Sequence, residues 1–110
     1  MQSTARYTPT KVAIAKVEAF IRELKDHGYH PIRAIVFGSY AKFRQHKDSD
    51  IDLAVWDEKF EGSSPLDIEP ILSLMRKYSA IELHTFSPDD TYENHPFVKE
   101  IVDTGIEIAM

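Results

Sequence analysis

The first regular pattern in the chain is an amphipathic segment. Over residues 9–27, apolar side chains recur at steps of three and four positions, which places them on one face of a helix. Thr8 is suited to cap this helix, Pro9 to begin its first turn, and Gly28 to end it in a left-handed conformation. We therefore predict a first helix over residues 9–27, after a loose lead-in over residues 1–7. Its apolar face consists of Ala13, Val17, Phe20, Ile21 and Leu24.

Two apolar runs after this helix predict neighbouring strands. Residues 32–37 are β-branched and apolar on nearly both faces, as expected for a central strand. Residues 51–56 alternate instead, so that Asp52 points away from the face formed by Ile51, Leu53 and Val55. Asp50 shares the face of Asp52, and the strand therefore carries two carboxylates on one side.

A third strand is predicted over residues 80–86. Its alternation puts Ile81 and Leu83 on one face, and Glu82 and His84 on the other. His84 could contact a substrate, or it could be an ordinary polar neighbour with its hydrogen bonds satisfied. The pattern leaves both interpretations open.

The remaining segments predict loops, two helices and a short strand. We expect a loop over residues 57–65 and a helix beginning near Glu69 and Pro70, since proline is tolerated only in the first turn. Phe97, Ile101 and Val102 indicate a last helix, closed by Gly105 and followed by a short strand over residues 106–108. This order predicts an α/β protein in which helices pack on a β-sheet.

Composition narrows the class of protein. The chain has 110 residues, 43% of them hydrophobic, which fits one folded domain over residues 1–110 with one core. Because cysteine is absent, disulfides and thiolate chemistry are excluded. No segment has the roughly 18 apolar residues of a membrane span, and the N-terminus does not resemble a signal peptide. We expect a soluble, cytoplasmic protein that does not contact a membrane.

The distribution of charge along the chain is more informative about a phosphate and metal site than the net charge is. A net charge of −5 disfavours direct binding to nucleic acid. Lys42, Arg44 and Lys47 form a basic cluster, whereas residues 50–69 carry seven acids and one lysine. A basic loop beside an acidic segment suits a site for phosphate and metal, although charge alone is more typical of a solvated loop.

The two carboxylates of the second strand are candidate metal ligands. Side chains at positions i and i+2 of a strand stand about 7 Å apart at their α-carbons, so the oxygens of Asp50 and Asp52 can converge. Two such charges about 5 Å apart repel by roughly 3 kcal/mol at an effective dielectric of 20. Mg²⁺ removes this cost, because it is usually held by one or two carboxylates and by substrate phosphates. Taken alone, an Asp-x-Asp pattern is more typical of a solvent-facing strand.

A glycine and a serine follow the first strand directly. Gly38 allows an anion to approach the backbone, and Ser39 adds a hydroxyl donor. Such a pair by itself is most often a plain turn. Twelve residues after Gly38, Asp50 begins the acidic strand, so both features are expected at the same end of adjacent strands. The combination is more specific than either part.

These two segments resemble a known signature. Residues 36–42 (Val-Phe-Gly-Ser-Tyr-Ala-Lys) and 49–55 (Ser-Asp-Ile-Asp-Leu-Ala-Val) are similar to the motif of the polymerase-β-like nucleotidyltransferase superfamily, and the chain looks like its minimal nucleotidyltransferase branch. The resemblance implies a mixed-sheet α/β fold. It also implies that Asp50, Asp52 and Glu82 form a catalytic acidic triad that binds Mg²⁺ or Mn²⁺.

The resemblance also implies which residues hold the nucleotide. The triphosphate of ATP would be bound by Gly38, Ser39, Lys42 and Ser49. Lys42, Arg44 or Lys47 would steady the leaving pyrophosphate. The chain departs from the pattern at two positions: Phe43 stands where a second glycine is common, and Glu82 stands where the third acid is commonly aspartate.

A chain of this size has little room for a large acceptor pocket. Minimal members of the branch are commonly paired with a small helical HEPN-type ribonuclease toxin, to which they transfer AMP as antitoxins. The resemblance therefore implies a partner protein that carries the acceptor hydroxyl. The alternative is a catalytically idle binding module that neutralises a partner by contact alone, and the two departures favour it. Association of several copies of the chain is a further open alternative.

Overall fold

The computed structural model describes residues 10–38 and 50–110. In these residues the helices and strands follow one another in the predicted alternating order. The elements are α1 (Thr10–Asp26), β1 (Arg33–Phe37), β2 (Ile51–Trp56), α2 (Pro65–Ile68), the 3₁₀ turn η2 (Glu69–Ile71), α3 (Leu72–Lys77), β3 (Ile81–Phe86), α4 (Pro96–Thr104) and β4 (Ile106–Glu107).

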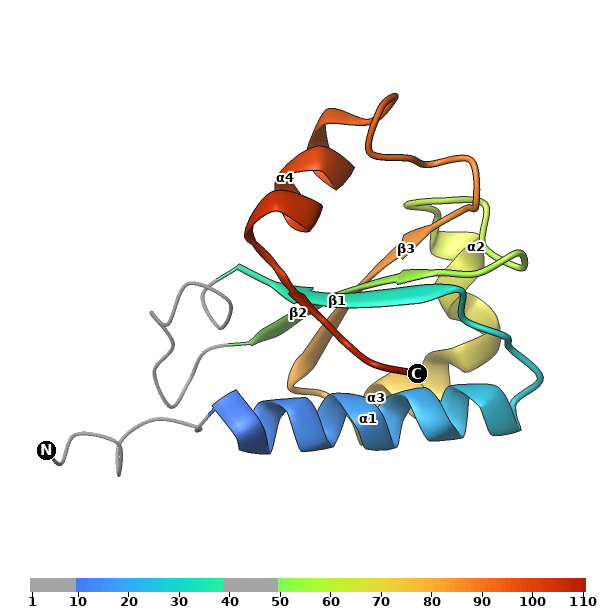
Figure 1. Cartoon of the computed structure of the whole chain (residues 1–110). Helices are drawn as coiled ribbons and strands as arrows, with labels where there is room; N and C mark the ends of the chain where they lie inside the picture. Colours follow the sequence, from blue (N-terminus) through green and yellow to red (C-terminus); the bar gives the residue numbers. More distant parts are fainter. Residues whose placement is uncertain (1–9, 39–49) are drawn as a thin grey trace, which may run out of the picture.

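The strands form a mixed sheet in the order β3-β2-β1-β4. β1 pairs antiparallel with both β2 and β4, whereas β2 and β3 run parallel. Figure 1 shows α1 and α3 below this sheet and α4 above it. The predicted α/β class and the mixed sheet are both confirmed.

The first helix buries the face that its periodicity predicts. Ala13, Val17, Phe20 and Leu24 are fully buried, and Ile21 nearly so. Gly28 has a φ of +92°, the left-handed conformation predicted for the residue that ends the helix. Thr8 and Pro9, the predicted start of the helix, lie outside the described residues.

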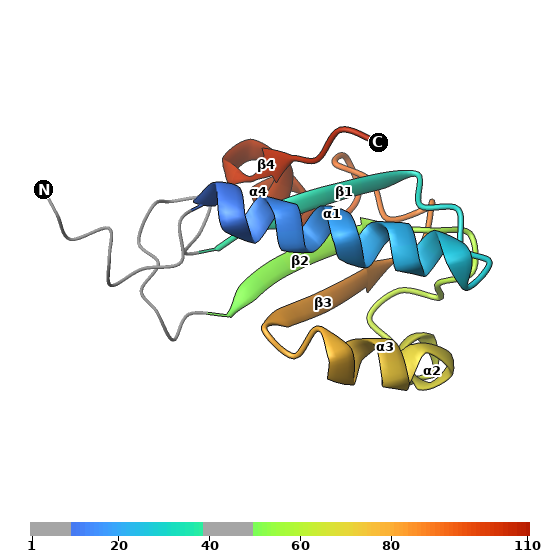
Figure 2. The same ribbon diagram turned by 90° about the horizontal axis from the view of Figure 1, so that it is seen from below.

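Both faces of the two central strands are covered. One face packs on α1 and α3 through alternate residues that include Val36, Leu53 and Val55. The other face packs on α4 through Phe37, Ala54 and further residues of the sheet. Figure 2 shows α1 running along the sheet, with α3 close to β3. Each large aliphatic side chain buried in these layers contributes about 1.5–3 kcal/mol, which explains why both strands are apolar on nearly every position.

The second helical segment begins earlier than predicted. It starts at Pro65 rather than near Glu69, and Ser64 caps it by accepting a hydrogen bond from the backbone N–H of Leu66 at 3.1 Å. Pro70 lacks a backbone N–H, and the chain passes through the 3₁₀ turn at this point before α3 begins. Pro70 therefore interrupts a helical segment that begins at Pro65.

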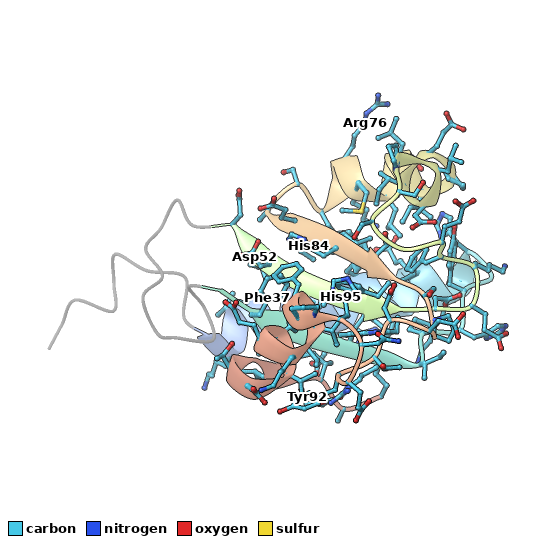
Figure 3. The ribbon with its side chains drawn as sticks, turned by 90° about the horizontal axis from the view of Figure 1, so that it is seen from above. Phe37, Asp52, Arg76, His84, Tyr92 and His95 are labelled. Atoms are coloured by element: carbon cyan, nitrogen blue, oxygen red, sulfur yellow. The ribbon has the colours of Figure 1, made fainter. Side chains whose placement is uncertain are left out.

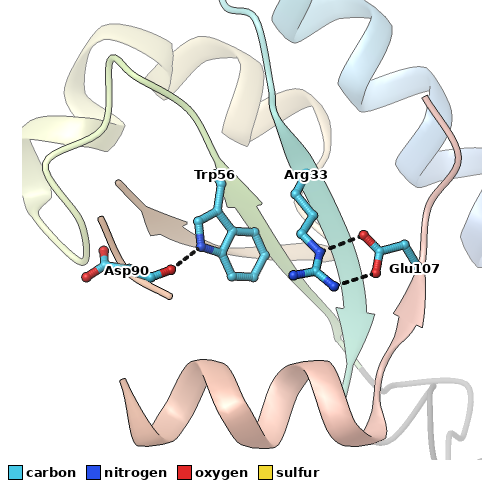
Figure 4. A network of polar contacts seen from close by, with 4 residues as sticks. All are labelled: Arg33, Trp56, Asp90 and Glu107. Atoms are coloured by element: carbon cyan, nitrogen blue, oxygen red, sulfur yellow. Dashed lines mark hydrogen bonds and ion pairs between the residues drawn. The ribbon is translucent and has the colours of Figure 1, made fainter. Parts of the chain in front are cut away.

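The short strand β4 is held to the sheet by a polar network at one end of β1. The guanidinium of Arg33 donates from Nε and Nη2 to the two carboxylate oxygens of Glu107, at 2.7 and 2.9 Å (Figure 4). The same guanidinium lies 5.8 Å from the ring centre of Trp56, whose Nε1 donates to the backbone oxygen of Asp90 at 2.8 Å. This network joins β1, β2 and β4 at the end of the sheet where β1 begins.

Candidate active site

Two acids face each other on neighbouring strands at the other end of the sheet. In the parallel pairing of β2 and β3, Asp52 lies directly opposite Glu82. Adjacent strands are about 4.8 Å apart, so the two side chains rise side by side from the same face of the sheet. This is the face that α4 covers further along, since Ala54, two residues after Asp52, packs in the α4 layer.

Gly38 stands next to this acidic pair. It follows Phe37, which pairs with Asp52 across β1 and β2. Its φ of +74° is a conformation that residues with a side chain rarely adopt, and a β-carbon at this position would lie 2.4 Å from Oδ2 of Asp52. The glycine is therefore required for two reasons: the turn needs its backbone conformation, and the carboxylate occupies the space where a side chain would be.

The closeness of the acids changes the protonation of Glu82. Partial burial raises the pKa of its carboxyl, and the negative charge of Asp52 and a hydrogen bond to Asp52 raise it further. The charge of Asp50 acts in the same direction, whereas His84 acts against it. Burial and neighbouring negative charge both disfavour the ionised form of this carboxyl.

His84 completes the group. Its Nε2 lies 3.4 Å from Oδ1 of Asp52, and both side chains are roughly three-quarters buried, at 28% and 27% exposure. Its ring packs edge-on against Phe37 at 4.9 Å and lies 6.0 Å from Phe97 of α4, measured between ring centres. Figure 3 shows Phe37, Asp52 and His84 gathered at this end of the sheet.

The predicted site residues are not all brought to the same point. Asp52, Glu82 and His84 each offer one ligand atom, and these atoms lie within 4.8 Å of one another. Asp50 is exposed just before β2 and is not part of this group, although its charge reaches Glu82. The role of Asp50 as a metal ligand stays a prediction. The other predicted nucleotide contacts lie outside the described residues: Ser39, Lys42, Arg44, Lys47 and Ser49. Phe43, one of the two departures from the family motif, lies outside them as well.

Two other acids of the 50–69 segment have structural roles. Asp57 is 1% exposed and accepts hydrogen bonds from the backbone N–H groups of His30 and Lys59, both at 2.8 Å. Asp67 is 4% exposed and accepts from two backbone N–H groups of the preceding loop and from the hydroxyl of Thr85. These two residues contribute to the acidic character of residues 50–69, but their oxygens fix loops and do not belong to the candidate site.

A cavity of about 360 Å³ lies away from the acidic group. It is lined by Arg33 and Trp56, together with residues that precede α4, and so it opens near the start of β1 and the end of β2. Asp52 lies at the opposite end of β2 and Glu82 on β3, and neither lines the cavity. The lining combines the rings of Trp56 and Tyr92 with the charged Arg33, Asp90 and Glu93, and contains none of the residues of the acidic group.

The donors in the acidic group fit a divalent cation. Two carboxylates held close enough to raise the pKa of one of them carry a repulsion that a cation would remove. Their oxygens and the histidine nitrogen are within reach of one point, and both Asp52 and His84 remain partly open to solvent. Asp52 and Glu82 would hold the cation, with Asp50 at the mouth of the site.

The candidate site thus combines an acid on each of two neighbouring strands with a glycine turn beside them. The family model described as "Polymerase beta, Nucleotidyltransferase" matches residues 18–109. The chain therefore belongs to the polymerase β nucleotidyltransferase family. A search of curated proteins finds no match to the chain. Across residues 10–38 and 50–110, none of the helices combines the length and the apolar character needed to cross a membrane.

The sequence pattern found His84 but left its role open. Its side chain was predicted to share the face of Glu82, and that prediction is confirmed by the grouping of the two with Asp52. The contact with Phe97 could not have been predicted, because it depends on how α4 lies across the sheet. The only signal in the sequence was the two-residue spacing from Glu82.

Proposed function

We propose that this protein is a nucleotidyltransferase that uses Mg²⁺ or Mn²⁺ to transfer AMP from ATP to a hydroxyl group on an acceptor. The observation that carries the proposal is the position of Asp52 directly opposite Glu82, beside Gly38, in a chain of the polymerase β family. The raised pKa of Glu82 supports it, since its causes are burial and, after that, the negative charge of Asp52 beside it.

In this proposal the acids hold the reactants in line. Asp50, Asp52 and Glu82 bind the cation, which when bound neutralises charge on the phosphates. Gly38 and Ser39 position the triphosphate. The acceptor oxygen forms a bond to the α-phosphorus while the bond between that phosphorus and the bridging oxygen to the β-phosphate breaks, and pyrophosphate leaves. Glu82 orients the acceptor hydroxyl or accepts its proton.

We further propose that the acceptor hydroxyl belongs to a partner protein, a small helical toxin of the HEPN type, which this protein inactivates as an antitoxin. The resemblance of residues 36–42 and 49–55 to the minimal nucleotidyltransferase branch supports this step. The small size of the chain supports it as well, because an acceptor pocket of its own would need further structure.

The test uses ATP labelled at the α-phosphate, the purified protein and the product of the neighbouring reading frame. Label should move to the partner protein in the presence of Mg²⁺ or Mn²⁺. Glu82→Gln keeps the size and the hydrogen bonding of the side chain but removes the basic oxygen, so transfer should fall by on the order of 10²-fold or more while ATP binding is largely kept.

Glu58→Gln is the matched control, because Glu58 is an exposed acid at the other end of β2. It should transfer label at the wild-type rate. If the wild-type protein neutralises its partner without transferring label, and Glu82→Gln neutralises it equally well, the protein is a binding module and not an enzyme.

A further inference from the structure

We propose that His84 is a ligand of the same cation as Asp52 and Glu82, so that the site selects a divalent transition-metal ion, such as Mn²⁺, over Mg²⁺. The inference deepens the proposed function by naming the cation that its metal site prefers. The third-strand acid and the histidine come from alternate positions of β3, which the pleat points to the same face.

The distance between His84 and Asp52 is long for a hydrogen bond and leaves room for both to bind one cation. A good N–H···O bond is about 2.9–3.0 Å long, and contacts beyond about 3.2 Å are weak. Neighbouring ligands of an octahedral cation with bonds of about 2.1 Å are roughly 3.0 Å apart, and opposite ligands roughly 4.2 Å. The observed 3.4 Å between Nε2 and Oδ1, and the 4.8 Å limit for the whole group, lie close to this range.

The ring of His84 is oriented for this role by its neighbours. Phe37 packs against it at 63° between ring planes and Phe97 at 74°, from β1 and α4 respectively. Phe97 also packs against Phe37 at 5.6 Å, so the two phenyl rings support each other and the imidazole. A ring held between two fixed aromatic side chains loses little further freedom when it binds a metal, which favours binding.

The mixed donor set determines the preference. Mg²⁺ favours oxygen ligands and keeps its waters, whereas imidazole nitrogen suits transition metals better. Asp52 and Glu82 provide oxygens that either kind of ion accepts. The nitrogen of His84 is the donor that separates them, and it lies 3.4 Å from Oδ1 of Asp52.

The experiment titrates the full chain with Mn²⁺ alone and, separately, with Mg²⁺ alone. Electron spin echo spectra of the Mn²⁺ complex detect a directly bound imidazole through the modulation from its ¹⁴N nucleus. We expect this modulation in the wild-type protein and in His95→Gln, the matched control, since His95 lies on the same side of the sheet but packs on Phe86 and caps α4. We expect it to be lost in His84→Gln.

Calorimetry with the same two ions gives the selectivity. His84→Gln should weaken Mn²⁺ binding by about tenfold and change Mg²⁺ binding by much less, so that the preference falls by about tenfold. His84→Asp supplies an oxygen in place of the nitrogen. This variant should bind ions again, with the preference moved toward Mg²⁺. Such binding would show that the loss in His84→Gln comes from the missing ligand and not from unfolding.

The inference is overturned if the wild-type complex gives no ¹⁴N modulation, if the modulation persists in His84→Gln, or if the ratio of the two affinities is unchanged. Its failure is distinguishable from failure of the proposed function. If label is transferred with Mg²⁺ and the Mn²⁺ complex shows no nitrogen ligand, this inference is wrong and the proposed function stands. If Mn²⁺ is bound by the nitrogen and no label is transferred, the proposed function is wrong and this inference stands.

Discussion

The carboxylate of Asp52 fills the space beside Gly38: its Oδ2 lies 2.4 Å from the point where a β-carbon of residue 38 would be. The glycine turn and the acidic strand are therefore a single packed unit. A change in the turn is transmitted directly to the carboxylate.

Gly38→Ala should therefore damage both stability and metal binding. An alanine at a φ of +74° costs about 1–2 kcal/mol, and its methyl group must displace the Asp52 carboxylate. Urea unfolding should show the loss of stability, and titration with Mn²⁺ should show weaker binding.

Gly28→Ala is the control for the backbone strain. Its φ of +92° is similarly unfavourable for alanine, but the nearest atom to its β-carbon is Nζ of the flexible Lys59, at 3.2 Å. This variant should lose comparable stability and keep its affinity for Mn²⁺. Equal loss of affinity in the two variants would contradict the direct coupling of Gly38 to Asp52.

Asp52→Asn should make the metal-free protein more stable. It removes the negative charge that helps to raise the pKa of Glu82. Removing such a repulsion from a functional site commonly adds on the order of 0.5–2 kcal/mol to the free energy of unfolding. The free energy of unfolding without metal measures the effect.

The comparison for this variant is Asp57→Asn. Each oxygen of Asp57 accepts a backbone N–H, and an amide keeps only one acceptor, so this change should cost about 1–3 kcal/mol. A loss of stability in Asp52→Asn of similar size would mean that Asp52, like Asp57, serves to satisfy donors.

The third prediction concerns metal and nucleotide together. Mg²⁺ or Mn²⁺ with ATP should raise the melting temperature by more than the sum of the separate effects, because each completes the coordination of the other. A ligand present at 100 times its dissociation constant stabilises by about 2.7 kcal/mol. Replacing Asp50 and Asp52 together by asparagine should abolish the extra shift, while Glu58→Gln should retain it. A full shift in the double variant would place the metal site elsewhere.

Local patterns were sufficient to predict the elements that carry the site. The alternation in residues 51–56 and 80–86 correctly put Asp52 on the face away from Ile51, Leu53 and Val55, and put Glu82 and His84 together on one face of the third strand, because successive side chains of a strand point to opposite faces. That the two strands are neighbours and parallel could not be read from spacing. It depends on the strand order of the whole sheet, and the family resemblance implied only a mixed sheet with Glu82 in a triad with Asp50 and Asp52.

The sequence pattern misleads where one residue type has two structural roles, as proline and aspartate do here. Pro70 suggests a helix start, but the helical segment begins at Pro65 with Ser64 as its cap. Asp57 and Asp67 add to the acidic character of residues 50–69, but their oxygens bind backbone N–H groups. A buried aspartate that fixes a loop has the same signature in the sequence as one that binds a metal, and only its hydrogen-bond partners separate the two.

Asp67 also contributes to the pH dependence of stability in acid. Burial acts to raise the pKa of its carboxyl, but hydrogen bonds from Glu61, Thr85, Gly62 and Ser64 outweigh it, and the pKa lies below the ordinary value of 3.8. Because the folded pKa is the lower one, the stabilising contribution of Asp67 is present above the unfolded pKa and is lost as the pH falls through the folded value.

Asp67→Asn should therefore cost about 1–3 kcal/mol at neutral pH, since the amide leaves at least one buried donor without an acceptor. The difference from the wild-type protein should shrink as the pH is lowered below about 4, where the wild-type carboxylate begins to lose its advantage. Urea unfolding from pH 7 to pH 3 measures both curves, with the exposed Asp89→Asn as the control that should follow the wild type. A difference that stays constant down to pH 3 would mean that the hydrogen bonds of Asp67 do not depend on its charge.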